Sequence, residues 1–209
     1  MQHDFILLDR SGSMITRWDE ALRGVNAYVE QLAKDKVDTG VTVAVFDTTP
    51  TGKLDFVVVR DRITPSTFKP VTKDDAEPRN GTPLSDAVGA IVGLARKGVP
   101  ITGEQYEKVA IIIVTDGEEN SSREYSVAQA KALLDDCRKD GWQVLFIGQD
   151  FQNSKQAMSF GNAANTTISS SSANMGATLR ATASKRGIYG LTGQSMVYSD
   201  DEKKKAAEI

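Results

Sequence analysis

Short apolar runs alternate along the chain with stretches in which apolar residues recur every three or four positions. The short runs are typical of buried strands and cover residues 4–9, 41–46, 54–59, 109–115, 142–147 and 166–169. The stretches with the longer period are typical of helices with one apolar face and cover residues 16–34, 83–96, 125–139, 154–160 and 173–185. This alternation predicts an α/β fold: a doubly wound (Rossmann-like), mostly parallel six-stranded sheet with helices on both faces.

The connection between the second and third predicted strands is a short turn, TPTGK at residues 49–53. A turn of this length cannot hold a helical crossover, so the two strands must pair as an antiparallel hairpin. The run at 109–115 contains consecutive β-branched residues and is the best candidate for a central strand buried on both faces. We therefore expect one antiparallel edge strand in an otherwise parallel sheet.

The end of the chain follows a different pattern. The apolar and aromatic residues from Tyr189 to Tyr198 follow Gly187 and are interrupted by Gly190 and Gly193, so they fit no helix. We expect them to pack as an extended segment or to act as a docking strand. The charged residues 200–209 are expected to form a solvated helical or disordered end. These features predict one domain over residues 1–186 and a partly flexible C-terminal extension over residues 187–209.

Composition limits the functional classes. The chain has 209 residues, 40% of them hydrophobic, which is enough for one well-buried domain. Its net charge of −3 and its mixture of signs indicate no basic face, so no nucleic-acid role is expected. The single cysteine, Cys137, has no disulfide partner and is interpreted as a small half-buried apolar residue in a reducing compartment. No stretch approaches the roughly 20 apolar residues of a membrane span, and the first apolar run is too short for a signal peptide, so we expect a cytoplasmic protein.

Acidic residues follow the predicted parallel strands. Asp9, Asp47 and Asp116 stand at strand ends, and Asp150 closely follows another strand. Ligands of such sheets bind at the carboxyl ends of the strands, so these carboxylates are expected to gather at one edge. An ordinary polar loop is an equally good interpretation of Asp47 and of Asp150.

The first of these aspartates belongs to a D-x-S-x-S sequence formed by Asp9, Ser11 and Ser13. A loop that leaves the strand here can curl one carboxylate and two hydroxyls around a hard cation, which prefers oxygen ligands. Gly12 permits the tight backbone that this curling requires. The triplet therefore predicts a metal site.

Three segments together resemble a von Willebrand factor A (vWA) domain with its metal-ion-dependent adhesion site (MIDAS): DRSGSM at 9–14, NGTPLSDA at 80–87 and IIIVTDGE at 111–118. The compact form is similar to bacterial or phage members of the family. The resemblance implies that Ser11 and Ser13 contact the metal directly, that Asp9 and Asp116 hold it mainly through water, and that Thr82 is a conditional ligand. Mg²⁺ is the expected ion, and Mn²⁺ or Ca²⁺ could substitute.

Four neighbouring residues leave alternatives open. Asp86 follows Thr82 by one helical turn, so it is either a second-shell acceptor or an ordinary aspartate on a helix surface. Glu118 and Glu119 could add negative potential to the site, but we expect them to be solvated. Arg10 is expected to point away from the metal.

The resemblance implies a non-enzymatic module that binds a carboxylate of a protein partner, in an intracellular assembly or adaptor role. His3 is the only histidine, which removes a catalytic triad, and no phosphate-binding glycine motif occurs. The enzymatic alternative is a Mg²⁺-dependent phosphatase with Asp9 as nucleophile. Such a phosphatase would carry a second aspartate at the position of Ser11. A structural subunit with a merely stabilising metal is a further alternative.

Overall fold

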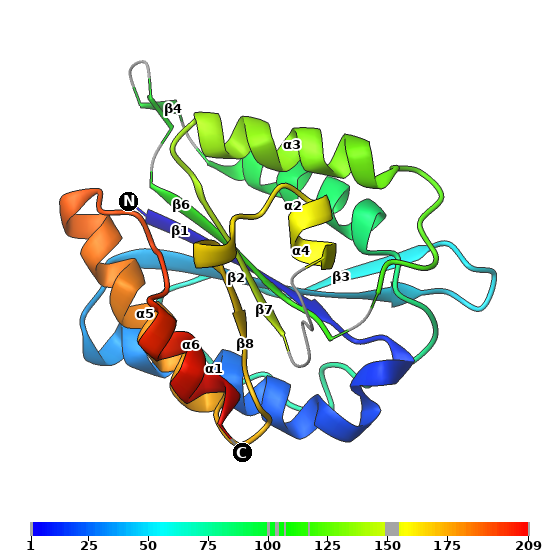
Figure 1. The fold of residues 1–209 in the computed structure, drawn as a ribbon, viewed down its shortest axis with the longest axis horizontal. Coiled ribbons are helices and arrows are strands. Elements are labelled where there is room, and N and C mark those ends of the chain that lie inside the picture. Colours follow the sequence, from blue (N-terminus) through cyan, green and yellow to red (C-terminus); the bar gives the residue numbers. More distant parts are fainter. Residues whose placement is uncertain are drawn as a thin grey trace.

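The computed structural model describes residues 2–99, 101–102, 105–106, 108–116, 118–148 and 155–208. Its main feature is a twisted six-stranded sheet between two layers of helices (Figure 1). The strands are, in spatial order, β3 (Leu54–Ile63), β2 (Thr39–Thr48), β1 (Gln2–Asp9), β6 (Val109–Val114), β7 (Gln143–Gly148) and β8 (Thr167–Ser169). All neighbouring pairs are parallel except β2 and β3, which confirms the predicted sheet and its antiparallel edge strand.

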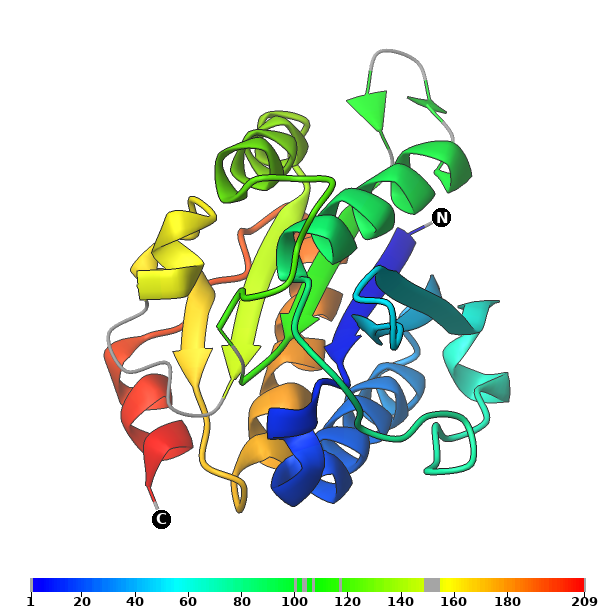
Figure 2. The same cartoon turned by 90° about the vertical axis from the view of Figure 1, so that its right-hand side faces the viewer.

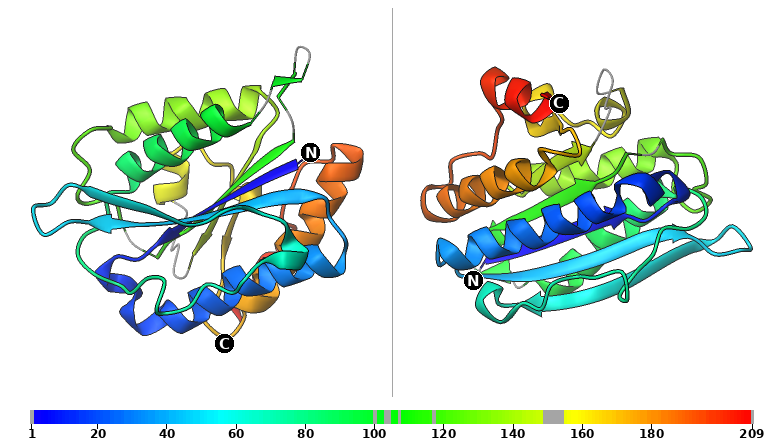
Figure 3. Two further views of the ribbon diagram at one scale, coloured as in Figure 1. Left: turned by 180° about the vertical axis from the view of Figure 1, so that it is seen from behind. Right: turned by 90° about the horizontal axis from the view of Figure 1, so that it is seen from below.

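The helices form two layers on opposite sides of the sheet (Figure 2). One layer holds α2 (Leu84–Gly98), α3 (Val127–Lys139) and the short α4 (Lys155–Ser159). The other holds α1 (Trp18–Lys34) and α5 (Met175–Thr192), which lie side by side, with α6 (Asp200–Ala207) near β8 (Figure 3). Short 3-10 helices, η1 (Gly12–Arg17), η2 (Pro65–Thr67) and η3 (Ala164–Thr166), and the small hairpin β4 (Ile101–Thr102) and β5 (Gln105–Tyr106) complete the elements.

Strand β1 shows why the sheet needs both helical layers. Ile6 and Leu8 pack into the core beneath α1 and α5, whereas Phe5 and Leu7 pack into the core beneath α2 and α3. Successive side chains of a strand point to opposite faces, so a strand that is apolar at every position must be covered twice. Each fully buried side chain of this size contributes about 1.5–3 kcal/mol to folding.

The C-terminal segment differs from the sequence-based prediction. Residues 187–192 continue α5, so the prediction that this segment fits no helix was wrong, and the helix runs through the predicted boundary at residue 186. The glycines within α5 permit close packing: a Cβ on Gly190 would meet the side chain of Gln2, and one on Gly187 would lie 3.2 Å from Val37 Cγ2. Gly193, with φ of +77°, ends the helix.

Beyond α5 the chain packs back onto the domain. The Tyr198 amide donates to the Asn165 carbonyl at 2.7 Å, and the Met196 amide donates to Gln143 Oε1 at 2.9 Å. Met196 and Tyr198 are buried, as expected for an extended packed segment. Residues 200–207 form α6, which begins with a capping box between Ser199 and Glu202.

Cys137 lies on α3 and is fully buried, deeper than the half-buried position expected from the sequence. Burial raises the pKa of its thiol to about 11, so the thiol stays protonated and unreactive at neutral pH. Among the residues that the structure describes, no helix combines the length and apolar character needed to cross a membrane.

Candidate metal centre

The D-x-S-x-S loop begins where β1 ends. Asp9 is the last residue of β1 and its side chain is fully buried. One carboxylate oxygen accepts a hydrogen bond from the Ser11 amide at 2.7 Å, and the other accepts one from the Thr115 hydroxyl at 2.6 Å. Asp9 therefore shapes its own loop and also joins the ends of β1 and β6.

A chain of hydrogen bonds connects this loop to Asp116. The hydroxyls of Ser11 and Ser13 lie 3.0 Å apart, and the Ser13 hydroxyl donates to Asp116 Oδ1 at 2.9 Å. Four of the five predicted ligands, from two loops about a hundred positions apart in sequence, thus lie together at the carboxyl edge of the sheet.

Thr82 is placed between these loops by its backbone. Its amide donates to Asn120 Oδ1 at 3.0 Å, and the Asn120 amide donates to the Thr82 carbonyl at 3.2 Å. On the other side of the segment, the Gly12 amide donates to the Asn80 carbonyl at 2.9 Å. The Thr82 side chain is buried, and no hydrogen bond of its hydroxyl occurs within the described part of the chain.

The donor set fits a hard divalent cation with mostly neutral direct ligands. Within the described residues, no three acidic, histidine or cysteine side chains are grouped to hold a metal, so a cation here would depend on the hydroxyls as well as on Asp9 and Asp116. Burial raises the pKa of Asp9 to about 6, although hydrogen bonds from Thr115 and Ser11 lower it. A nearby cation would offset the cost of holding this buried carboxylate in its charged form.

The family model for the von Willebrand factor type A domain matches residues 5–183, which include all five of these residues. The chain belongs to this family. The match includes all or part of every strand of the sheet, so the fold and the family assignment agree.

Solved structures with the same fold include a bacterial pilus adhesin and a matrix protein of the mussel byssus. The pilus adhesin SpaC of Lactobacillus rhamnosus GG, in its open conformation, aligns with a TM-score of 0.64 and 14% identity over 89% of this chain and 30% of the adhesin. Proximal thread matrix protein 1 from the mussel byssus aligns with a TM-score of 0.60 and 14% identity over 95% of this chain and 48% of that protein. This chain therefore spans less than half the length of either protein. No curated protein matches it significantly by sequence.

A network of two arginines and two aspartates supports the candidate metal loops of this vWA domain, which are the D-x-S-x-S loop and the segments that hold Thr82 and Asp116. Asp47, at the end of β2, accepts from Arg10 Nε at 3.0 Å and from Arg79 Nε at 2.9 Å, and Asp55 contacts both arginines. The backbones meet as well, because the Arg79 amide donates to the Arg10 carbonyl at 2.8 Å. The Arg10 side chain therefore points toward Asp47, which is consistent with the expectation that it points away from the candidate metal ligands.

This network changes the interpretation of the four aspartates expected at the sheet edge. Asp47 lies at that edge, but its carboxylate is neutralised by arginines and serves to hold the loops together. Asp150 lies outside the described residues.

Asp86 is held by the backbone of the loop that precedes α3. It is only 3% exposed, so it is not a helix-surface aspartate. Its two oxygens accept hydrogen bonds from the backbone amides of Arg123, Glu124 and Tyr125, at 2.8, 2.9 and 2.7 Å, and none from Thr82. Asp86 therefore anchors the loop that leads into α3.

Glu119 anchors the preceding part of the same loop. Glu118 is exposed, as expected, but the prediction that Glu119 is solvated was wrong. The Glu119 carboxylate accepts from the amides of Ser85, Ser121 and Ser122 and from the Ser122 hydroxyl, at 2.6–3.0 Å. Burial opposes its ionisation, but these hydrogen bonds prevail and hold the pKa of Glu119 below its usual value.

We expect Glu119→Gln to lower the free energy of unfolding by about 1–3 kcal/mol, because glutamine offers a single acceptor oxygen to four donors. A depressed carboxyl pKa stabilises the fold above the unfolded-state pKa, and this stabilisation is lost as the pH falls. The variant should therefore lose less stability than the wild type between about pH 6 and about pH 3, as measured by urea denaturation. Glu118→Gln is the matched control, and equal pH profiles for wild type and Glu119→Gln would contradict the role of Glu119.

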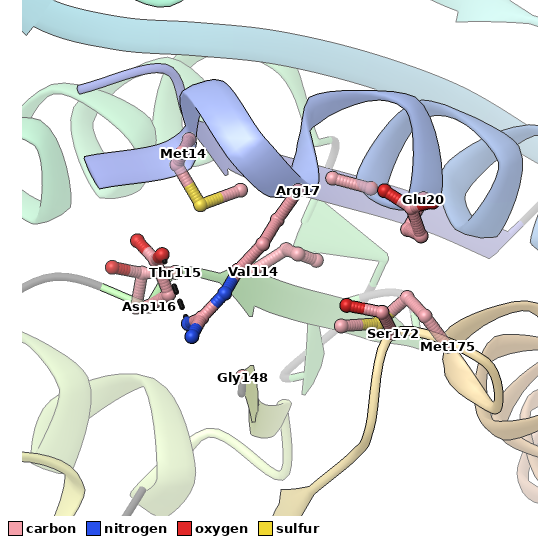
Figure 4. A pocket seen from close by; sticks show the side chains of 10 residues that line it. Met14, Arg17, Glu20, Val114, Thr115, Asp116, Gly148, Ser172 and Met175 are labelled. Carbon is pink, nitrogen blue, oxygen red and sulfur yellow. Dashed lines mark hydrogen bonds and ion pairs between the residues drawn. The ribbon is translucent and has the colours of Figure 1, made fainter. Parts of the chain in front are cut away.

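Arg17 also reaches the candidate site, although no sequence pattern predicts it there. It is the last residue of η1, and its Nη1 donates to Asp116 Oδ2 at 3.2 Å (Figure 4). No local motif marks this residue, because its proximity to Asp116 depends on the direction in which η1 leaves the metal loop.

Proposed function

We propose that this vWA domain is a non-enzymatic protein-interaction module that binds an acidic group of a partner through a divalent cation, with Mg²⁺ as the expected ion. Asp9, Ser11, Ser13, Thr82 and Asp116 would hold the cation. The observation that carries the proposal is the hydrogen-bonded series from Asp9 through Ser11 and Ser13 to Asp116. It brings two hydroxyls and two carboxylates to one edge of the sheet.

The chemistry of these ligands favours a partner that supplies a carboxylate. Ser11 and Ser13 would contact the cation through neutral hydroxyls, and Asp9 and Asp116 would hold it through water. Direct ligands that are mostly neutral leave much of the positive charge uncompensated, and a hard cation attracts an anionic oxygen ligand. The pilus adhesin with the same fold is an adhesive protein and gives this proposal general support.

The proposal includes an intracellular assembly or adaptor role, in which this domain joins components of a larger complex. Its support is the single cysteine, which is buried and leaves no pair for a disulfide within the chain.

The phosphatase alternative gains no support from the position of Asp9. A nucleophilic carboxylate must reach the phosphorus atom of a substrate, but Asp9 is fully buried and both of its oxygens accept hydrogen bonds from neighbouring residues. The geometry therefore favours binding over phosphoryl transfer.

The test compares Mg²⁺ binding by the wild type, Asp9→Asn and Asp74→Asn, measured by calorimetry and by thermal melting with Mg²⁺ or chelator. Asp74 is exposed on the loop before Asn80 and provides the matched loss of charge. We expect Mg²⁺ to bind and stabilise the wild type and Asp74→Asn, and Asp9→Asn to lose at least tenfold in affinity, about 1.4 kcal/mol. Unchanged binding in Asp9→Asn would contradict the metal site.

Partner binding is tested with the same variants. Pull-downs from a native lysate in Mg²⁺ or chelator should retain a partner only with Mg²⁺ and only with the wild type and Asp74→Asn. Partners retained equally under all conditions would contradict metal-mediated binding. Phosphatase turnover that requires Mg²⁺ and disappears in Asp9→Asn would instead support the enzymatic alternative.

A further inference from the structure

Arg17 brings a permanent positive charge to the metal loops. Its side chain extends from the end of η1 across a small pocket to Asp116 Oδ2 (Figure 4). The side chain of Arg17 is 30% exposed, whereas that of Asp116 is only 5% exposed, so the Asp116 end of this ion pair is shielded from solvent. A guanidinium remains charged at every pH at which the protein is folded.

Asp116 divides its two oxygens between two roles. Oδ1 accepts from Ser13, a proposed direct ligand of the cation, and Oδ2 accepts from Arg17. Arg17 and a divalent cation would therefore draw on the negative charge of the same carboxylate.

Among the residues that the structure describes, Glu20 is the second acidic residue that lines this pocket, along with Met14, Ser172 and Met175. Its carboxylate pairs with Arg23 at 2.7 Å, so its charge is already shared with another guanidinium. The acidic residue of this pocket that the structure shows paired with Arg17 is therefore Asp116, among the described residues.

We propose that Arg17 is an internal competitor of the divalent cation and sets its affinity for the metal loops. This inference rests on the proposed function of the same site. Like charges repel, and a shielded carboxylate such as Asp116 lowers the screening by solvent, so the guanidinium raises the free energy of a cation held by Ser13 and Asp116. Arg17 also donates a hydrogen bond to Asp116 Oδ2. Without Arg17, this oxygen could accept a hydrogen bond from a water molecule bound to the cation.

The test is a Mg²⁺ titration of the wild type, Arg17→Met, Arg17→Lys and Lys34→Met by calorimetry. Methionine keeps an apolar stem in the pocket and removes the charge, and lysine keeps the charge. Lys34 is exposed at the far end of α1, so Lys34→Met controls for the change in net charge. Melting curves in chelator verify that each variant is folded.

We expect Arg17→Met to bind Mg²⁺ about tenfold more tightly than the wild type, and the other two variants to stay within about threefold of it. Equal or weaker binding by Arg17→Met would overturn the proposal, and weaker binding would show that Arg17 positions Asp116 for the cation. If the wild type and Arg17→Met bind Mg²⁺ with equal affinity and Asp9→Asn abolishes binding, the proposed metal site is supported and the proposed role of Arg17 is not. If the wild type binds no Mg²⁺, the proposed function fails and this inference fails with it.

Discussion

Asp47→Ala is expected to lower the free energy of unfolding by about 3–5 kcal/mol, because it removes one partner of a buried ion pair. The Asp47 side chain is fully buried and that of Arg10 is only 7% exposed, so the variant leaves the Arg10 guanidinium with the partly exposed Asp55 as its remaining acidic partner. The same variant should weaken Mg²⁺ binding, because this network holds the loops of Ser11 and Thr82 together. Urea denaturation and calorimetry measure the two effects.

Asp55→Ala is the matched control for this network. Asp55 contacts the same two arginines, but its side chain is 30% exposed, so water can replace much of its contribution. We expect a loss of about 1 kcal/mol or less for this variant. Equal losses for Asp47→Ala and Asp55→Ala would show that burial of Asp47 does not determine the strength of the network.

Asp4→Ala is expected to have an effect of similar size at the opposite end of the sheet. Asp4 on β1 pairs with Arg186 on α5, and both side chains are fully buried. Burial disfavours the charge on Arg186, but Asp4 prevails and raises its pKa. Removing Asp4 leaves the Arg186 guanidinium with neutral acceptors such as the Lys108 carbonyl at 3.0 Å, so we expect a loss of about 3–5 kcal/mol in urea denaturation.

Two further variants separate an uncompensated charge from a simple loss of contacts. Asp4→Leu combined with Arg186→Met replaces both charges with apolar groups and should recover most of the stability lost in Asp4→Ala. Asp19→Ala breaks the exposed ion pair between Asp19, whose side chain is 52% exposed, and Lys73, whose side chain is 59% exposed. This variant should lower the free energy of unfolding by less than about 1 kcal/mol. A double variant as unstable as Asp4→Ala would contradict the explanation by uncompensated charge.

Local chemistry was sufficient wherever the responsible residues are close in sequence. The apolar runs of β1 and β6 predict strands because each of these segments is buried on both faces. Asp9, Ser11 and Ser13 lie within five consecutive positions, so their convergence follows from one tight loop. Thr82 and Asp116 were predicted through the resemblance to a family, and the structure brings their segments to this loop.

The errors occurred where a residue makes contacts that its type and the local pattern do not specify. Gly187 and Gly190 interrupt an apolar pattern, which favours a break in a helix, but in the structure they allow α5 to approach Val37 and Gln2. Glu119 is a charged residue in a polar loop, which predicts a solvated side chain. In the structure, the start of α2 and its own loop supply hydrogen-bond donors to its carboxylate. A propensity describes a residue in an average environment and cannot include such contacts.

The sequence by itself determined the strands, most of the helices and the oxygen ligands available to a metal, because these depend on side-chain type and short spacing. Only the tertiary structure decided the role of each aspartate. Asp9, Asp47 and Asp116 all stand at strand ends, but Asp47 meets two arginines, Asp116 meets Ser13 and Arg17, and Asp9 meets Thr115 and its own loop. The charge and function of a carboxylate depend on the groups within a few ångströms, and the fold brings those groups together from distant parts of the chain.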